Sequence, residues 1–153
     1  MELKFLPLQE DHLDRILEIE NQSFPLPWTK SMFERELSLP ISNFFVVYLE
    51  GEVIGYGGYW RVEDEAHIIN LAVDPKYRSK GIGRLILDFL TGVMRKQCLK
   101  KTLLEVRKNN MAAIGLYTSC GFKTVGLREK YYNNTDDAVL MEKQLSEILP
   151  QKA

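Results

Sequence analysis

A strand, a glycine-rich turn and an amphipathic helix follow one another between residues 67 and 94, and this succession constrains the fold most. Residues 67–73 are almost continuously apolar, which is typical of a largely buried strand, and Asp74-Pro75 ends the run. Beyond the turn, apolar side chains recur at helical spacing as far as Met94. Another apolar run follows at residues 103–106. We therefore expect an α/β (α+β) fold, with helices packed against a sheet.

The rest of the chain continues to alternate between the two patterns. β-Branched and aromatic runs around Glu50-Gly51 predict a hairpin, and Thr29 is a suitable cap for a helix. We expect a mixed sheet with helices on both faces. The other predicted elements are a strand at 3–5, a helix with Leu13, Ile16, Leu17 and Phe24 at helical spacing, a helix after Thr29, hairpin strands at 44–48 and 53–59, a helix at 112–120 and strands at 124–127 and 138–141. The stretch Phe24-Pro25-Leu26-Pro27-Trp28 cannot stay helical, because each proline restrains the residue before it.

Size and charge indicate one domain without a preference for nucleic acid or membranes. The chain has 153 residues, of which 45% are hydrophobic, and we expect a single domain over residues 1–145 with a C-terminal tail at 146–153. Lys and Arg number 20 against 21 Asp and Glu, without a long run of one sign. The N-terminus does not resemble a signal peptide, and no apolar stretch approaches about 20 residues. We expect a cytoplasmic protein, either a monomer or a weak dimer.

Cysteine and histidine usage does not indicate a metal site. Cys98 and Cys120 lack the spacing of a disulfide framework or of zinc ligands, so we expect both to be reduced packing residues. His12 falls on the polar side of the first predicted helix, where we expect it to be solvated. No metal is expected.

The turn that follows the buried strand can bind phosphate. In Arg78-Ser79-Lys80-Gly81-Ile82-Gly83, glycines permit close backbone approach, and the following helix directs its N–H groups and positive dipole end toward the turn. Arg78 and Lys80 would add charge. An ordinary glycine turn with solvated basic residues explains the motif equally well.

Four stretches stand in a specific order along the chain: Asn70-Leu71-Ala72-Val73-Asp74-Pro75, Arg78-x-x-Gly81-x-Gly83, Leu104-Glu105-Val106-Arg107 and Asn110-x-x-Ala113-Ile114-x-Leu116-Tyr117-x-x-x-Gly121-Phe122. In this order and spacing the chain resembles the GNAT superfamily of N-acetyltransferases. Phe24-Pro25-x-Pro27-Trp28 and Tyr131-Tyr132 are similar to the branch that contains the ribosomal-protein-alanine N-acetyltransferases and other protein N-terminal acetyltransferases. The resemblance covers nearly the whole chain.

The resemblance implies a mixed, mostly antiparallel sheet of about seven strands, with a V-shaped opening that receives acetyl-CoA. Pantetheine would pair with backbone at Leu71, Ala72 and Val73, as an added strand does. The pyrophosphate would lie against Arg78, Ser79, Lys80, Gly81, Ile82 and Gly83. Asn110 and Tyr117 would also contact the cofactor, although Asn110 is equally a good helix cap.

Acetyl transfer to an amine needs a base and a proton donor, and the resemblance implies Glu105 and Tyr117. Burial beside the cofactor would raise the pKa of Glu105, whereas periodicity alone would make it a solvent-facing strand residue. Tyr117 could instead be a core residue. His67 is an alternative base, because its ordinary pKa of about 6.5 suits the task, or it is structural. Cys120 lacks a paired base, which favours direct attack in a ternary complex over an acyl-cysteine.

Aromatic residues would border the acceptor site. The resemblance places Phe24, Leu26, Trp28, Tyr131 and Tyr132 there, while hydrophobic packing is the plain alternative for Phe24 and Trp28. Thr135-Asp136-Asp137 departs from the Gly-Glu-Asp of close relatives. The expected function is acetylation of a protein N-terminal α-amine, for instance on a ribosomal protein. The alternatives are a lysine or small-amine acetyltransferase and a non-catalytic CoA-binding regulatory module.

Overall fold

The computed structural model describes residues 2–132 and 136–145, and for residues 130–132 and 136 it describes the backbone alone. In chain order the elements are β1 (Leu3–Pro7), the 3-10 turn η1 (Glu10–His12), α1 (Leu13–Ser23), α2 (Lys30–Ser38), β2 (Ser42–Leu49), β3 (Glu52–Val62), β4 (Glu65–Val73), the 3-10 turn η2 (Pro75–Tyr77), α3 (Ile82–Lys96), β5 (Lys101–Arg107), α4 (Met111–Ser119), β6 (Lys123–Tyr132) and β7 (Asp136–Gln144). Every predicted helix and strand is present.

Within the described residues, seven strands form one sheet in the order β1-β2-β3-β4-β5-β7-β6. Five of the neighbouring pairs are antiparallel, and only β4 and β5 run parallel. The prediction of a mixed, mostly antiparallel sheet of about seven strands is therefore confirmed. The last strand, β7, inserts between β5 and β6, so residues from all three C-terminal strands lie near one another.

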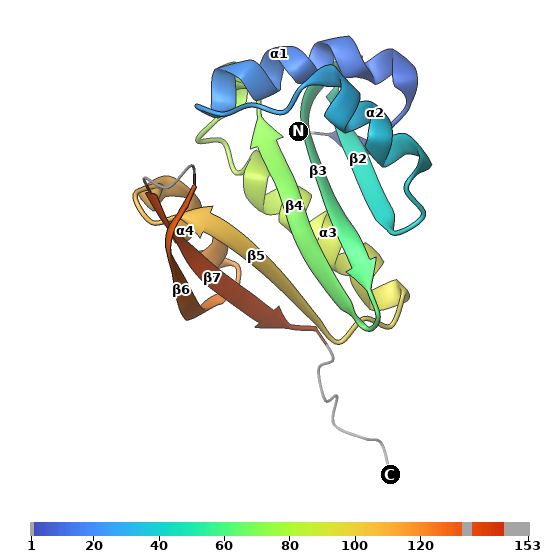
Figure 1. The fold of residues 1–153 in the computed structure, drawn as a ribbon. Coiled ribbons are helices and arrows are strands. Elements are labelled where there is room, and N and C mark those ends of the chain that lie inside the picture. Colours follow the sequence, from blue (N-terminus) through green and yellow to red (C-terminus); the bar gives the residue numbers. More distant parts are fainter. Residues whose placement is uncertain (1, 133–135, 146–153) are drawn as a thin grey trace.

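The sheet opens at its centre. β4 and β5 are paired only at their beginnings, where His67 lies opposite Leu103, and the two strands then diverge (Figure 1). β4 carries a bulge at the same place, because Ile68 pairs with Tyr59 and Asn70 pairs with Gly58, which leaves Ile69 as the extra residue. A bulge bends its strand and increases the twist. The predicted V-shaped opening is present beyond His67.

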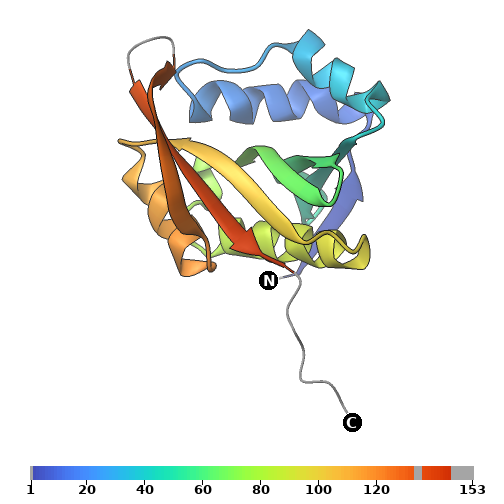
Figure 2. The same ribbon diagram turned by 60° about the horizontal axis from the view of Figure 1, so that its bottom comes forward.

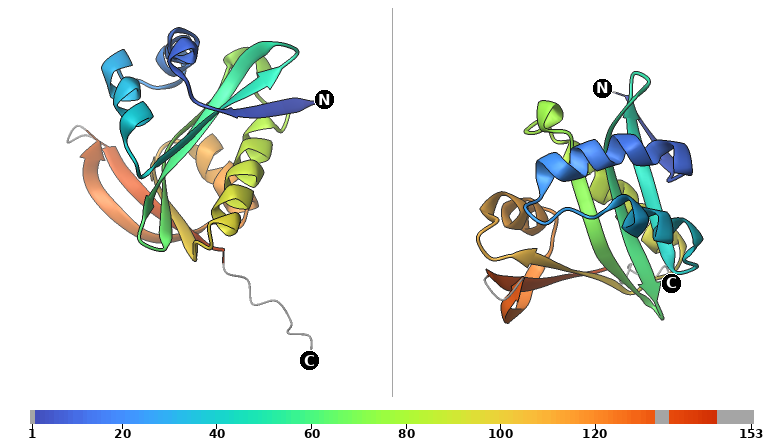
Figure 3. Two further views of the ribbon diagram at one scale, coloured as in Figure 1. Left: turned by 90° about the vertical axis from the view of Figure 1, so that its right-hand side faces the viewer. Right: turned by 45° about the horizontal axis from the view of Figure 1, so that its top comes forward.

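Helices cover both faces of the sheet, as predicted (Figure 2). On one face, α1 and α2 lie across β2, β3 and β4 (Figure 3). Their buried side chains, among them Ile16, Ile19 and Phe33, form one core cluster with that face. On the other face, α3 and α4 pack against a second cluster that includes Ile86 and Leu90. Burying apolar surface on both faces fixes the strands that frame the opening.

Local sequence signals explain where α1 and α2 end and begin. Pro25 disfavours helical geometry in the residue before it, and Phe24 is accordingly extended, so α1 ends at Ser23. The prediction that the helix does not continue through Phe24-Pro25-Leu26-Pro27-Trp28 is therefore confirmed. Thr29 caps α2 as predicted, since its hydroxyl accepts a hydrogen bond from the Met32 N–H at 3.3 Å.

Two side chains lie elsewhere than predicted. His12 is buried rather than solvated, because it belongs to the turn η1 before α1 and so does not follow the helix periodicity. Its Nδ1 accepts from the Gln9 N–H at 2.9 Å, and its Nε2 lies 3.0 Å from the Tyr48 hydroxyl. Cys98 is exposed in a left-handed turn after α3 and is therefore not a packing residue, whereas Cys120 is buried.

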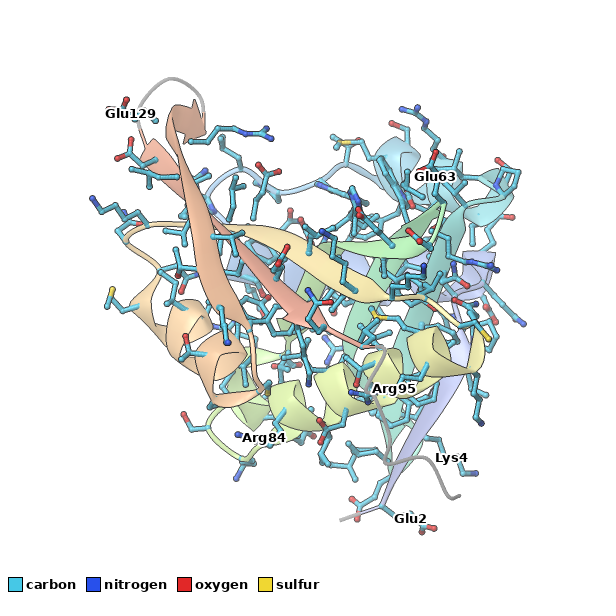
Figure 4. The ribbon with its side chains drawn as sticks, turned by 90° about the horizontal axis from the view of Figure 1, so that it is seen from below. Glu2, Lys4, Glu63, Arg84, Arg95 and Glu129 are labelled. Carbon is cyan, nitrogen blue, oxygen red and sulfur yellow. The ribbon has the colours of Figure 1, made fainter. Side chains whose placement is uncertain are left out.

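Charge is distributed over the surface without a dominant sign. Figure 4 shows acidic and basic side chains from several elements around the molecule, of which Glu2, Lys4, Glu63, Arg84, Arg95 and Glu129 are labelled. Within residues 2–132 and 136–145, no cluster of three His, Cys, Asp or Glu side chains is arranged to hold a metal ion. No helix in the same residues is long and apolar enough to cross a membrane.

Asp74 joins α1 to the end of β4. Its buried carboxylate accepts from the Lys76 N–H at 2.9 Å and pairs with the guanidinium of Arg15, which also donates to the Val53 carbonyl at 2.9 Å. Burial alone would raise the pKa of Asp74, but the Lys76 N–H and the Arg15 cation outweigh burial and hold this pKa below its usual value.

Acidification should therefore destabilise the protein through Asp74. A lowered pKa in the folded state means that the carboxylate stabilises the fold above the ordinary aspartate value of about 3.9, and that this contribution is lost as the pH falls below it. Asp74→Asn should cost about 1.5–3 kcal/mol in the free energy of unfolding at neutral pH and should flatten the acid slope. Urea unfolding at several pH values measures both.

Asp14→Asn is the matched control for this prediction. Asp14 also lies in α1 and pairs with Lys30 at 3.3 Å, but its side chain is 89% exposed. Exposed pairs contribute little, so this variant should unfold as the wild type does. An Asp74→Asn variant that keeps the wild-type acid slope would assign that slope to other carboxylates.

Candidate active site

A cavity of about 300 Å³ lies in the opening of the sheet. Its walls come from the end of α1 and the loop after it, the bulged middle of β4, the second half of β5, and α4 with its N-cap. The cavity thus joins the segment that carries the predicted acceptor residues to the segments that carry the predicted catalytic residues. Its position follows from the divergence of β4 and β5.

Glu105 contributes to the β5 wall. Its neighbours Leu104 and Val106 are buried, whereas the Glu105 side chain remains 30% exposed and lines the cavity. Arg128 reaches across β7 and places Nη1 3.1 Å from Glu105 Oε2, within ion-pair distance although not in the orientation of a hydrogen bond. The predicted burial of this carboxylate is therefore partial.

Asn110 and Tyr117 contribute to the wall formed by α4. Asn110 caps this helix, because its side-chain oxygen accepts from the Ala113 N–H at 3.1 Å, and it also lines the cavity. Tyr117 lines the same cavity and packs edge-on against Phe122, with ring centroids 5.6 Å apart. Both residues therefore have a structural contact and an accessible side. The cap and core interpretations do not exclude the predicted functional ones.

The wall from β4 offers backbone as well as side chains. Leu71 lines the cavity, whereas Ala72 and Val73 are buried beyond it. From Ile68 onward, β4 pairs only with β3 among the described strands, so its other edge faces the opening. An unpaired strand edge is suited to adding an extended ligand by backbone hydrogen bonds.

The glycine-rich turn lies outside this cavity, at the N-terminus of α3. Ser79 and Gly81 both have left-handed φ values, 62° and 82°, and Gly81 is the N-cap, without a side-chain capping bond. The first N–H groups of a helix lack intrahelical partners, so they remain available to an anion. The guanidinium of Arg78 donates to the Val73 carbonyl at 3.0 Å and to the Ser23 hydroxyl at 2.8 Å.

The loop between α1 and α2 forms the opposite wall. Phe24, Leu26 and Trp28 all line the cavity, and Leu26 is exposed. Trp28 also packs against Phe33, with ring centroids 5.0 Å apart, so packing is part of its role. The side chains of Tyr131 and Tyr132 and all of Thr135 lie outside the described residues. The backbone of Tyr132 pairs with Asp136 where β6 and β7 meet.

His67 lies apart from the other predicted catalytic residues. Its side chain is 43% exposed, its Nε2 is 3.3 Å from Glu65 Oε1, and it does not line the cavity. It stands at the base of the V, where β4 and β5 are still paired. The structure therefore brings Glu105, Asn110 and Tyr117 together and leaves His67 outside.

Sequence reasoning missed Glu20, a carboxylate in α1 that also lines the cavity. It is 1% exposed and accepts from the Tyr56 hydroxyl, from Asn70 Nδ2 at 3.0 Å and from the Trp28 N–H at 2.9 Å. Burial, and then the Glu20 charge, raise the pKa of Tyr56 well above its usual value. The available signal was its spacing, because Glu20 follows Ile16 by four residues on the apolar face of α1.

Comparisons with known proteins agree with this geometry. The acetyltransferase (GNAT) family profile matches residues 13–122. The chain is 34% identical to the [ribosomal protein bS18]-alanine N-acetyltransferase of Escherichia coli over 142 residues, covering 91% of this chain and 95% of that protein. It is 40% identical to the N-alpha-acetyltransferase RimI of Mycobacterium tuberculosis over 126 residues, covering 77% of each. The crystal structure of the Escherichia coli ribosomal-protein-S18-alanine N-acetyltransferase matches with a TM-score of 0.89 and 29% identity, covering 99% of both chains.

Proposed function

This chain belongs to the GNAT acetyltransferase family and is an N-acetyltransferase, and we propose that it acetylates the N-terminal α-amine of a ribosomal protein. The observation that carries the proposal is that the proposed catalytic residues and the proposed acceptor residues line the same cavity. One wall holds Glu105 and Tyr117, and the opposite wall is the stiff, partly exposed loop with Phe24 and Leu26. One similar protein is named for the alanine of ribosomal protein bS18, and another is named an N-alpha-acetyltransferase. The alanine in the first name supports a small first residue in the acceptor.

The acceptor must lose a proton before it can attack. A free α-amine has a pKa of about 7.7–8.0, against about 10.4 for lysine, so a carboxylate base at neutral pH is better matched to a chain end. Glu105 takes this proton, and Tyr117 donates one to the departing thiolate. Acetyl-CoA, when bound, supplies the thioester carbon that the amine attacks. The transfer is direct, in a ternary complex.

The described residues fit this acetyl donor at two places. The open edge of β4 at Leu71 offers backbone groups for pantetheine, and the turn at Gly81 leaves the first N–H groups of α3 available to the pyrophosphate. An added Cβ at Gly81 would meet no described atom within 4 Å, so the protein leaves space there. Asn110, at the cap of α4, lies on the same side of the cavity as Tyr117.

Gly81→Val should raise the Michaelis constant for acetyl-CoA by about tenfold or more and leave that for the peptide nearly unchanged. The side chain would occupy the space next to the helix N-terminus and strain a φ of 82°, and losing one or two charge-assisted hydrogen bonds costs about 1.5–3 kcal/mol. Steady-state kinetics with each substrate varied in turn measures the two constants.

Gly51→Val controls for the backbone strain. Gly51 has nearly the same φ, 83°, and equally open surroundings, but it lies in the β2–β3 turn. Its variant should lose similar stability without changing either Michaelis constant. If both variants change the acetyl-CoA constant alike, the turn at Gly81 has no special part in binding the donor.

The acceptor class is tested with a peptide series. Each peptide carries one internal lysine, differs only in its first residue and is supplied with a free or a blocked N-terminus. We expect acetylation of the free peptides at the α-amine, fastest with a small first residue, and negligible reaction of the blocked ones. Fragment mass spectrometry locates the acetyl group. Equal rates on the lysine of the blocked peptides would exclude an α-amine acceptor and favour a lysine acetyltransferase.

A further inference from the structure

We propose that Glu20 is a positioning residue that holds the acceptor wall of the cavity at a set place relative to β4. The inference rests on the proposed function, because it assigns the loop after α1 to the acceptor. Glu20 comes from α1, and its three hydrogen-bond donors come from three other segments: Tyr56 in β3, Asn70 in β4 and the backbone of Trp28 in the loop. One carboxylate thus connects the loop after α1 to the two strands, β3 and β4, on one side of the opening.

The hydrogen bonds show why Glu20 anchors rather than acts as a base. Oε1 accepts from both Tyr56 and Asn70, and Oε2 accepts from the Trp28 N–H. A carboxylate offers about four lone-pair sites, so three of them are occupied within the protein. Glu105, by contrast, has its ion pair with Arg128 and 30% exposure. The two carboxylates of the cavity therefore have separate roles.

The positions of Asn70 and Trp28 show which two segments Glu20 joins. Asn70 follows the bulged Ile69, at the point where β4 leaves β5, and Trp28 ends the proline-containing loop. Within that loop, Pro25 and Pro27 have no N–H, so few backbone donors are available to attach it to the rest of the molecule. The Trp28 N–H bond to Glu20 is thus the polar link that joins the loop to the bulge through one side chain.

Glu20→Gln is the decisive substitution because it keeps the volume and changes one contact. The amide oxygen can still accept from Tyr56 and Asn70, but the NH₂ group then faces the Trp28 N–H, donor against donor. We expect the Michaelis constant for the peptide to rise by about tenfold or more, since a hydrogen bond to a charged group is replaced by two facing donors. The Michaelis constant for acetyl-CoA should change less than twofold.

Glu36→Gln is the matched control. Glu36 is also a buried helix glutamate, 6% exposed, that accepts from Ser42 and from the Trp60 indole, at 2.7 and 2.8 Å, but it does not line the cavity. A purely structural role for Glu20 predicts that both variants lose thermal stability and keep both Michaelis constants. Asn70→Ala is a second test that leaves Glu20 and Trp28 intact, and we expect a smaller rise in the peptide constant alone.

Hydrogen exchange of the Trp28 amide, followed by NMR, gives a readout that needs no acetylation. The amide should exchange faster in Glu20→Gln than in the wild type and should be unchanged in Glu36→Gln. If Glu20→Gln leaves Trp28 exchange and the peptide constant unchanged, the positioning role is overturned. If instead the wild type acetylates no α-amine peptide, the proposed acceptor is wrong, and the exchange rates still decide whether Glu20 holds the loop.

Discussion

Glu105→Gln is expected to lower the rate of acetyl transfer by about 10²–10⁴-fold at neutral pH, the usual loss when a general base is removed. The amide has the same shape, so the β5 wall of the cavity keeps its form, but it cannot take the proton of the incoming amine. The pH–rate curve of the variant should lose its rising limb. Stopped-flow measurement of thiol release over a range of pH records both effects, and the Michaelis constant for acetyl-CoA should remain near that of the wild type.

Glu142→Gln is the control for this experiment. Glu142 lies on the neighbouring strand β7, is 25% exposed against 30% for Glu105, and also has an ion pair, with Lys101 at 3.6 Å. It does not line the cavity, so its variant should keep the wild-type rate and pH profile. If Glu105→Gln retained full activity, His67 would become the better base, and His67→Gln would then be the variant to measure.

Tyr117→Phe is expected to slow the chemical step by about 10²–10⁴-fold while acetyl-CoA still binds normally. The phenyl ring retains the edge-on contact with Phe122, so the substitution removes only the hydroxyl of this cavity-lining residue. Without a proton donor, the thiolate is a poorer leaving group. Single-turnover rates, compared with acetyl-CoA affinity from calorimetry, separate the two quantities.

Tyr77→Phe provides the corresponding control. Tyr77 donates to Glu52 at 3.2 Å in the turn after β4, away from the cavity, and its loss should leave the single-turnover rate unchanged. A Tyr117→Phe variant with a normal chemical rate and weakened acetyl-CoA affinity would identify Tyr117 as a binding residue instead of an acid.

The order of helices and strands could be predicted because it depends on local patterns. Alternating or continuous apolar runs indicated the strands, and Thr29 and Gly121 marked a helix start and a helix end because of their own chemistry. Motif spacing predicted the family in the same way, and the structure places Glu105, Asn110 and Tyr117 at one cavity. Errors occurred at His12 and Cys98, which lie in turns next to α1 and α3 and therefore do not follow the helical period.

Tertiary structure alone decided which residues meet across the sheet. In the sequence, Glu20 is a charged residue on the apolar face of α1, and no partner for it can be identified nearby. Its hydrogen-bond donors are residues 28, 56 and 70, which the fold brings to it. Arg128 in β6 meets Glu105 in β5 across the intervening strand β7, a contact that depends on the strand order β5-β7-β6. By itself, the sequence determined the elements, the family and part of the cavity lining, because these follow from short-range periodicity and motif spacing. The partners of each carboxylate depend on strand order and on where β4 and β5 separate, and only the folded chain brings those distant residues together.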